Sequence, residues 1–131
     1  ADRSAVVAAR IMGVIARLPV REGDRVRAGQ TLAVLDSQEL AHRVRGAEMA
    51  LAAAKEHQAL ADATWRRYRS LYEEKALTTQ EMDQIAAQKK VAASEVERAR
   101  AGAEEARTYE AFTVLKAPFA GMTRFRTRGM A

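Results

Sequence analysis

The chain has 131 residues, no cysteine and a formal net charge of +5 at pH 7. The absence of cysteine excludes disulfides, thiolate metal sites and cysteine nucleophiles. No apolar run approaches the roughly 20 residues that a membrane-spanning helix needs. Charged residues make up 30% of the chain and aromatic residues 5%, a composition typical of long paired helices rather than of a large globular core.

The positive charge is concentrated at the two ends of the chain. Residues 36–110 hold 12 basic and 14 acidic side chains, whereas the two flanks together hold 10 basic and 3 acidic ones. Because a helix that follows nucleic-acid phosphates needs clustered positive charge, we expect no nucleic acid along the central segment. The first flank contains a cluster of arginines, Arg17, Arg21, Arg25 and Arg27. They form either a solvated rim or a contact with Glu22 or Asp24 of a neighbouring subunit.

The N-terminal flank, residues 6–36, has the pattern of short strands. Apolar side chains alternate there with polar or small ones, at Ile15, Leu18, Val20, Val26, Leu32 and Val34. Gly23 beside Asp24, and Gly29 further on, mark two tight turns, since glycine adopts the positive φ that a reversal demands. Pro19 restricts its strand to a sheet edge or a bulge.

A long helix is predicted from residue 37 onward, with Asp36 or Ser37 as its cap. Apolar or small side chains recur in steps of four and three, at Leu40, Val44, Ala47, Leu51, Ala54, Gln58, Ala61, Trp65, Tyr68 and Tyr72. Such a heptad seam indicates packing against a partner helix, and its alanines allow that partner to approach closely.

The helical pattern breaks at Lys75 and resumes after a capping box. Thr78 supplies the hydroxyl for an exposed amide, and Glu81 reaches back from the first turn. The second helix repeats the seam at Ile85, Lys89, Ala92, Val96, Ala99, Ala103 and Ala106. So short a connection predicts an antiparallel hairpin over residues 37–110 with its tip near 72–79.

The chain becomes strand-like again after Glu110. Val114 and Leu115 precede an Ala-Pro-Phe sequence, and Gly121 marks a further turn. We therefore predict an α+β protein in which two β half-domains, residues 1–36 and 111–131, are interrupted by the hairpin.

Two segments carry a family resemblance. GVIARLPVREGDRVRAGQTLAVLD at residues 13–36 and LKAPFAG at residues 115–121 resemble the two lipoyl-type half-motifs of periplasmic adaptors, the membrane fusion protein family. The order of half-motif, hairpin and half-motif matches that family across almost the whole chain. The resemblance implies a lipoyl-like β-sandwich without a cofactor or enzymatic activity. It also implies that the chain is part of a longer adaptor.

The resemblance further implies partners and a location. Family members act in the periplasm, form homo-oligomeric rings of about six subunits, and connect an inner-membrane efflux transporter to an outer-membrane channel of the TolC type. In adaptors of resistance–nodulation–division (RND) pumps, and of some ABC pumps, an Arg, a Leu and a Ser at the hairpin tip dock into the channel. Arg67, Leu71 and Thr78 occupy those spacings, with Thr in place of Ser. Alternatively, Leu71 packs in the seam, Arg67 is solvated and Thr78 is only a cap.

Other interpretations remain open. The chain could serve an ABC-type exporter or a type I secretion system, or be a general coiled-coil module. A lipoyl or biotinyl carrier would need Lys116 as its modified lysine, although such a lysine lies at a turn and Lys116 lies in a strand-like run. His42 and His57 lack the helical spacing of a metal pair. The aromatic stripe of Trp65, Tyr68 and Tyr72 is either core packing or a docking surface.

Overall fold

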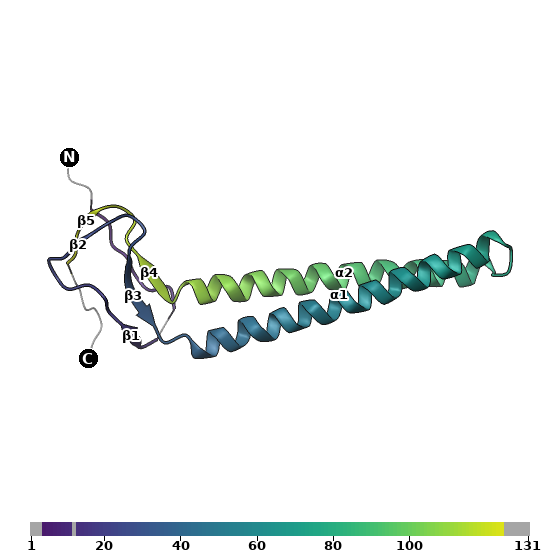
Figure 1. Cartoon of the computed structure of the whole chain (residues 1–131), viewed down its shortest axis with the longest axis horizontal. Coiled ribbons are helices and arrows are strands. Elements are labelled where there is room, and N and C mark those ends of the chain that lie inside the picture. The colour runs from purple at the N-terminus through teal and green to yellow at the C-terminus, as the bar shows by residue number, and fades with distance from the viewer. Residues whose placement is uncertain (1–3, 12, 125–131) are drawn as a thin grey trace. The chain divides into compact units, whose positions relative to one another are not determined.

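A computed structural model of the chain describes residues 4–11 and 13–124 (Figure 1). The elements in chain order are β1 (Ile15–Arg17), β2 (Arg25–Val26), β3 (Thr31–Leu35), α1 (Gln38–Glu73), α2 (Thr79–Ala111), β4 (Val114–Lys116) and β5 (Gly121–Met122). They form two compact units: a β unit, Ala1–Ala41 with Thr108–Ala131, and a helical unit, His42–Arg107. Residues 125–131 of the predicted second β flank lie outside the described residues.

In the β unit, both flanks of the chain contribute to the same sheets. The first sheet has the strand order β1-β3-β4, and the second pairs β2 with β5; all pairs are antiparallel. In the first sheet, Ala33 faces Leu115 across the β3–β4 pair. In the second, Val26 faces Gly121. Because each sheet joins a strand before α1 to a strand after α2, the two flanks are halves of one unit, and the predicted fold class is confirmed.

Two consecutive hexapeptides with the pattern Val-Arg-x-Gly-(Asp/Gln)-x, residues 20–25 and 26–31, build equivalent turns. In the first, the Asp24 amide donates to the Arg21 carbonyl at 3.0 Å and Gly23 has a φ of 90°. In the second, the Gln30 amide donates to the Arg27 carbonyl at 3.0 Å. The turns themselves are residues 21–24 and 27–30, and glycine is the third residue of each. A type II turn needs a positive φ at that position, which disfavours every residue with a Cβ.

The same six-residue spacing recurs in the C-terminal flank. The Gly23 amide donates to the Thr123 carbonyl at 2.9 Å, and the Gly29 amide donates to the Ala117 carbonyl at 2.8 Å. Thr123 and Ala117 each return a bond, to the carbonyls of Asp24 and Gln30 respectively, at 2.9 Å. Each turn is therefore held to the second flank by an equivalent pair of hydrogen bonds.

The core of the β unit is small. Val20 and Val26, six residues apart, are buried with Ala117, and Leu32 packs against them. Pro19 lies between β1 and β2 and belongs to neither strand, so the predicted edge or bulge position is not observed. Composition predicts a turn at Gly121, but this residue begins β5 instead. Its backbone lacks the positive φ of Gly23 and Gly29.

In the helical unit, α1 and α2 run antiparallel and side by side (Figure 1). With 36 and 33 residues they measure about 54 and 50 Å at 1.5 Å per residue. The side chains buried between them are Leu51, Ala92, Val96 and Ala103. Three of the four are alanine or valine. The layer of buried side chains between the helices is therefore thin and consists mostly of methyl groups.

Candidate functional site

The tip begins where α1 ends in a Schellman motif. The Ala76 amide donates to the Leu71 carbonyl at 2.9 Å, and the Lys75 amide donates to the Tyr72 carbonyl at 3.0 Å. Lys75 takes the left-handed conformation, with a φ of 61°. Lysine at the position where such motifs favour glycine carries backbone strain, and it places a flexible cation at the turn between the two helices.

Thr78 begins α2 as its N-cap. Its Oγ1 accepts the Glu81 amide at 3.1 Å, and its hydroxyl donates to the Glu81 carboxylate at 2.9 Å. The Met82 amide then donates to the Thr78 carbonyl at 3.0 Å and opens the helical ladder. The hydroxyl half of the predicted capping box is thus present, with Glu81 bonded to the hydroxyl.

The other two predicted docking residues are exposed near the end of α1. Leu71 has 36% of its surface exposed. Arg67 lies one helical turn earlier, and its guanidinium carbon is 6.0 Å from the centre of the Tyr68 ring. Tyr72 is 39% exposed, and its hydroxyl lies 3.3 Å from Thr79 Oγ1 on the other helix. Arg67 and Leu71 therefore share one strip of α1, since residues four apart are neighbours on a helix.

Most of the predicted packing residues line the inside of the hairpin. Leu51 and Val96 are buried in one cluster with Ala103. Leu40, Val44, Trp65, Tyr68 and Ile85 are half-buried. The polar seam residue Lys89 places its Nζ 3.9 Å from the centre of the Trp65 ring, and Arg69 approaches the same ring at 5.0 Å. Trp65 thus accommodates a charge in the seam through cation–π contacts.

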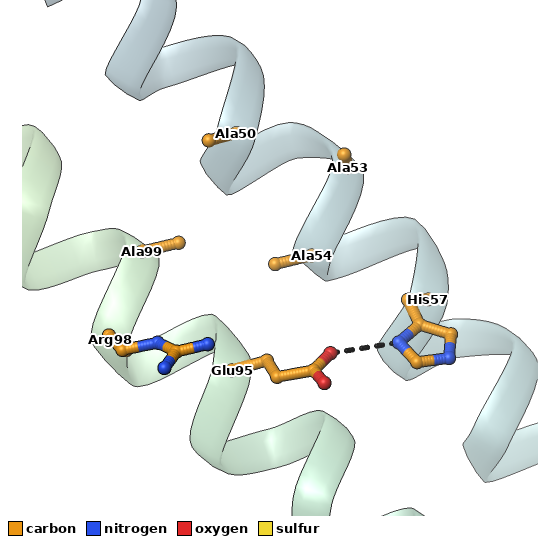
Figure 2. A pocket seen from close by; sticks show the side chains of 7 residues that line it. All are labelled: Ala50, Ala53, Ala54, His57, Glu95, Arg98 and Ala99. Atoms are coloured by element: carbon orange, nitrogen blue, oxygen red, sulfur yellow. Dashed lines mark hydrogen bonds and ion pairs between the residues drawn. The ribbon is translucent and has the colours of Figure 1, made fainter.

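An ion pair and a histidine–carboxylate hydrogen bond connect the described parts of the two helices. Arg107 Nη2 lies 3.1 Å from Glu48 Oε1, and His57 Nδ1 lies 2.9 Å from Glu95 Oε2. Beside the second pair is a shallow groove, shown in Figure 2, which is lined by Ala50, Ala53, Ala54, His57, Glu95, Arg98 and Ala99. Sequence reasoning missed this groove, because its position depends on which residues of α1 and α2 face one another.

The histidines and Lys116 bear on two of the alternative interpretations, a metal site and a carrier domain. Among residues 4–11 and 13–124, no three His, Asp or Glu side chains are grouped so that they could hold a metal ion. His42 lies 3.5 Å from Arg45 on its own helix and apart from His57. Lys116 is an exposed residue of β4 that faces Thr31. It does not lie at a turn, where a carrier domain presents its lysine.

The β unit exposes a set of cations. The side chains of Arg17, Arg21, Arg25, Arg27 and Arg124 are all exposed. None of these guanidinium groups has an ion-pair partner within residues 4–11 and 13–124. Asp24 Oδ2 accepts a hydrogen bond from the Arg21 amide at 2.8 Å. Of the two acidic residues near these arginines, Glu22 therefore has the carboxylate that is more available to a partner. Neither helix of the described chain is long and apolar enough to cross a membrane.

Comparison with known proteins identifies the family. The sequence profile of the CzcB-like, barrel-sandwich hybrid domain matches residues 3–127. The chain belongs to this family. The nickel-cobalt-cadmium resistance protein NccB of Alcaligenes xylosoxydans is 38% identical over 103 residues, which are 79% of this chain and 25% of that protein. The multidrug export protein AcrE of Escherichia coli is 33% identical over 121 residues, 92% of this chain and 31% of that protein.

A solved structure supports the same fold. The membrane fusion protein Spr0693 of Streptococcus pneumoniae superposes with a TM-score of 0.72 at 19% identity, over 91% of this chain and 48% of that one. The relatives of this CzcB-like chain are thus adaptor proteins of efflux systems, which combine a barrel-sandwich domain with a helical hairpin. The chain spans only 25% of NccB and 31% of AcrE.

Proposed function

We propose that the chain is the hairpin-bearing part of a periplasmic adaptor that links an inner-membrane efflux transporter to an outer-membrane channel. The pairing of β3 with β4, and of β2 with β5, carries this proposal. Because the strands before and after the hairpin are bonded to each other, both ends of the hairpin continue into the same β unit. Such an arrangement serves a mechanical role, in which the chain holds a long helical pair and catalyses no reaction.

The tip supplies the docking element for a channel of the TolC type. Arg67 offers a planar fork of donors for carbonyl or carboxylate oxygens. Leu71, at 36% exposure, offers an apolar side chain one turn away. Thr78 adds a hydroxyl at the start of α2. A contact of this size is weak for a single subunit, so its strength depends on repetition around a ring of subunits.

The β units pack side by side in that ring, which we propose to be hexameric as in the family. The exposed arginines of one β unit meet Glu22 and Asp24 of the next. Glu22 is the stronger candidate, since the Asp24 carboxylate already accepts an amide of its own turn. The inner-membrane transporter is engaged by parts of the protein outside this chain.

The names of the relatives suggest the cargo. NccB, a nickel-cobalt-cadmium resistance protein, shares 38% identity with the chain, whereas the multidrug protein AcrE shares 33%. We therefore propose export of divalent metal cations. The tip spacing of Arg67, Leu71 and Thr78 favours an RND-type transporter, with an ABC-type exporter as the alternative. Growth of a dependent strain in gradients of nickel, of cobalt and of drugs distinguishes metal export from drug export.

Leu71→Asp tests the tip. In a strain whose resistance depends on the protein carrying this chain, the variant should lose resistance, because a carboxylate cannot enter an apolar pocket without a large desolvation cost. Two matched variants, Leu71→Met at the same position and Ala59→Asp on the same helix away from the tip, should retain it. Circular dichroism and immunoblotting establish that all three variants fold and accumulate. Full resistance in the Leu71→Asp strain would refute docking through this tip.

A further inference from the structure

The face of α1 that points away from α2 carries exposed apolar side chains. The buried Leu51 marks the side of α1 that faces α2. At 3.6 residues per turn, Met49, Glu56 and Leu60 lie about 140–180° around the helix from Leu51. Met49 is 67% exposed and Leu60 is 64% exposed. Glu56 has no ion pair or hydrogen bond to any residue in the described part of the chain. We call Met49, Glu56 and Leu60 the α1 outer face.

The face of α2 that points away from α1 contains a hollow. The lining of this α2 hollow comes from α2 alone, from Lys90, Val91, Ser94, Glu95 and Arg98. Residues three and four apart are neighbours on a helix, so the last four of these residues enclose one gap. A gap of this kind receives a single side chain of a facing helix. Val91, Ser94 and Arg98 lie about 140–160° around the helix from the buried Val96. Within residues 4–11 and 13–124, Arg98 has neither an ion pair nor a hydrogen bond from its side chain.

The α1 outer face and the α2 hollow lie at the same height along the hairpin. His57 Nδ1 lies 2.9 Å from Glu95 Oε2, and the two helices run antiparallel (Figure 1). Ser94 is therefore level with about residue 58 of α1, and Arg98 with about residue 54. Leu60 and Glu56 lie within about two residues of those levels, or about 3 Å along the axis. One edge of the hairpin thus presents an apolar side chain and a carboxylate at the height where the other edge presents a hollow and a guanidinium.

We propose that the hairpins of two copies of this chain pack side by side in the same direction, with the α1 outer face of one copy against the α2 hollow of the next. Leu60 enters the hollow, and Glu56 pairs with the neighbour's Arg98. Because each copy uses a different face on each side, the contact is heterologous and repeats from copy to copy, as in a closed ring. This contact rests on the ring proposed above and extends it from the β units to the hairpins.

A second gap, seven residues further along α2, supports the same arrangement. It is enclosed by Arg98, Ala101, Gly102 and Glu105, all of which are exposed. Its centre is level with about residue 51 of α1, close to Met49. A Cβ added at Gly102 would meet open space, so the hairpin by itself does not require a glycine there, although glycine destabilises a helix interior. The approach of the neighbour's Met49 gives this glycine a role.

The charges set the register of the contact. Arg45 lies on the same side of α1 as Glu56, eleven residues or about three turns before it. Glu105 is level with about residue 47 of α1, so Arg45 faces the neighbour's Glu105 while Glu56 faces the neighbour's Arg98. A slip of one heptad in one direction would bring Arg45 to Arg98, and a slip in the other would bring Glu56 to Glu105. Like-charge repulsion opposes both slips.

Engineered cysteines test the contact, because the chain has no cysteine. In cells that produce the full-length protein, Leu60→Cys combined with Ser94→Cys should give a ladder of disulfide-linked dimers, trimers and larger species on mild oxidation, since every copy carries both partners. Ala59→Cys combined with Ser94→Cys is the matched control and should give little linkage, because Ala59 projects about 100° around α1 from Leu60. Efficient linkage of Leu60→Cys alone would establish a two-fold contact and overturn the proposal, as would the absence of a ladder from the Leu60→Cys, Ser94→Cys protein.

Charge reversal tests the pairing. In the Leu60→Cys, Ser94→Cys protein, Glu56→Arg or Arg98→Glu should slow the formation of the ladder roughly threefold or more, because each replaces an exposed ion pair by a repulsion. Both reversals together should restore the rate, since the pair is reformed with its signs exchanged. Lys55→Glu, a reversal at an exposed position outside the α1 outer face, should leave the rate unchanged. A protein with both reversals that links as slowly as those with one would refute the contact.

The tip variant separates this contact from the proposed function. If Leu71→Asp abolishes resistance and the Leu60→Cys, Ser94→Cys protein forms no ladder, the side-by-side packing of the hairpins is refuted and the adaptor role stands. If the ladder forms and Leu71→Asp leaves resistance intact, docking through the tip is refuted and the packing of the hairpins stands.

Discussion

Replacing Lys75 with glycine should stabilise the hairpin. Lys75 has a φ of 61°, a left-handed conformation that costs a residue with a Cβ roughly 1–2 kcal/mol. Glycine relieves that cost but gains freedom in the unfolded chain, which removes about 0.4–1 kcal/mol of the benefit. The net expectation for Lys75→Gly is therefore a gain of about 0.5–1 kcal/mol.

Thermal unfolding followed by circular dichroism at a helical wavelength measures this gain. For a domain of 60–100 residues, each kcal/mol moves the midpoint by roughly 4–8 °C, so the expected rise is about 2–8 °C. Lys75→Ala is the matched control, because it removes the charge and the long side chain but keeps the Cβ. If the alanine variant gains as much as the glycine variant, the side chain and not the backbone is the source of the instability, and the reasoning is refuted.

Three further predictions address the core, the turns and the cap. Leu51→Ala should cost about 2–3 kcal/mol in urea unfolding, since Leu51 is buried, whereas Leu60→Ala, at 64% exposure, should change stability by under about 0.5 kcal/mol. Gly29→Ala should destabilise the β unit by about 1 kcal/mol or more in urea unfolding, because the φ of Gly29 is 81°. Gly121→Ala is the control: the added Cβ would meet open space, so urea unfolding should be nearly unchanged. Thr78→Ala should lower the thermal midpoint through the loss of about 1 kcal/mol of capping, whereas Thr78→Ser should not.

The hairpin is predictable because its signals are local. A heptad pattern, a short break and a capping threonine follow one another along the chain, and each constrains the backbone by itself. The structure places α1 over Gln38–Glu73 and begins α2 at Thr79. The heptad pattern assigns Tyr72 to the seam, and its hydroxyl lies 3.3 Å from Thr79 Oγ1 of α2, although the residue is 39% exposed close to the tip.

The β unit is predictable only in part. Gly23 and Gly29 are recognisable as turn residues, and both take the positive φ that turns select. Composition alone assigns Gly121 to a turn, but its backbone is bonded in β5. Sequence reasoning missed the tandem Val-Arg-x-Gly hexapeptide, although the pattern itself is visible along the chain. The role of the repeat becomes clear only from Ala117 and Thr123. These residues lie after the hairpin, and each forms the same pair of backbone hydrogen bonds with one of the two turns.

The groove in Figure 2 is beyond the reach of sequence reasoning. Its α1 wall is formed by Ala50, Ala53, Ala54 and His57, whose shared side of the helix follows from periodicity. The side on which α2 places Arg98 does not follow from periodicity, because it depends on the pairing of His57 with Glu95. A heptad pattern defines the inside of a hairpin, whereas its outer faces are defined only once the register of the two helices is known.

The cap also limits how Thr78 can take part in docking. A hydroxyl has one hydrogen to donate and two lone pairs that accept. At Thr78 the hydrogen is directed to the Glu81 carboxylate, and one lone pair accepts the Glu81 amide. With the cap intact, one lone pair is left, so Thr78 can meet a partner only as an acceptor from a donor on the channel. Serine offers the same single acceptor, because the added methyl of threonine lies on the Cβ and not on the oxygen. A threonine at this position, where the family motif has serine, is therefore compatible with docking, provided that the partner leaves space for one methyl group beside its donor.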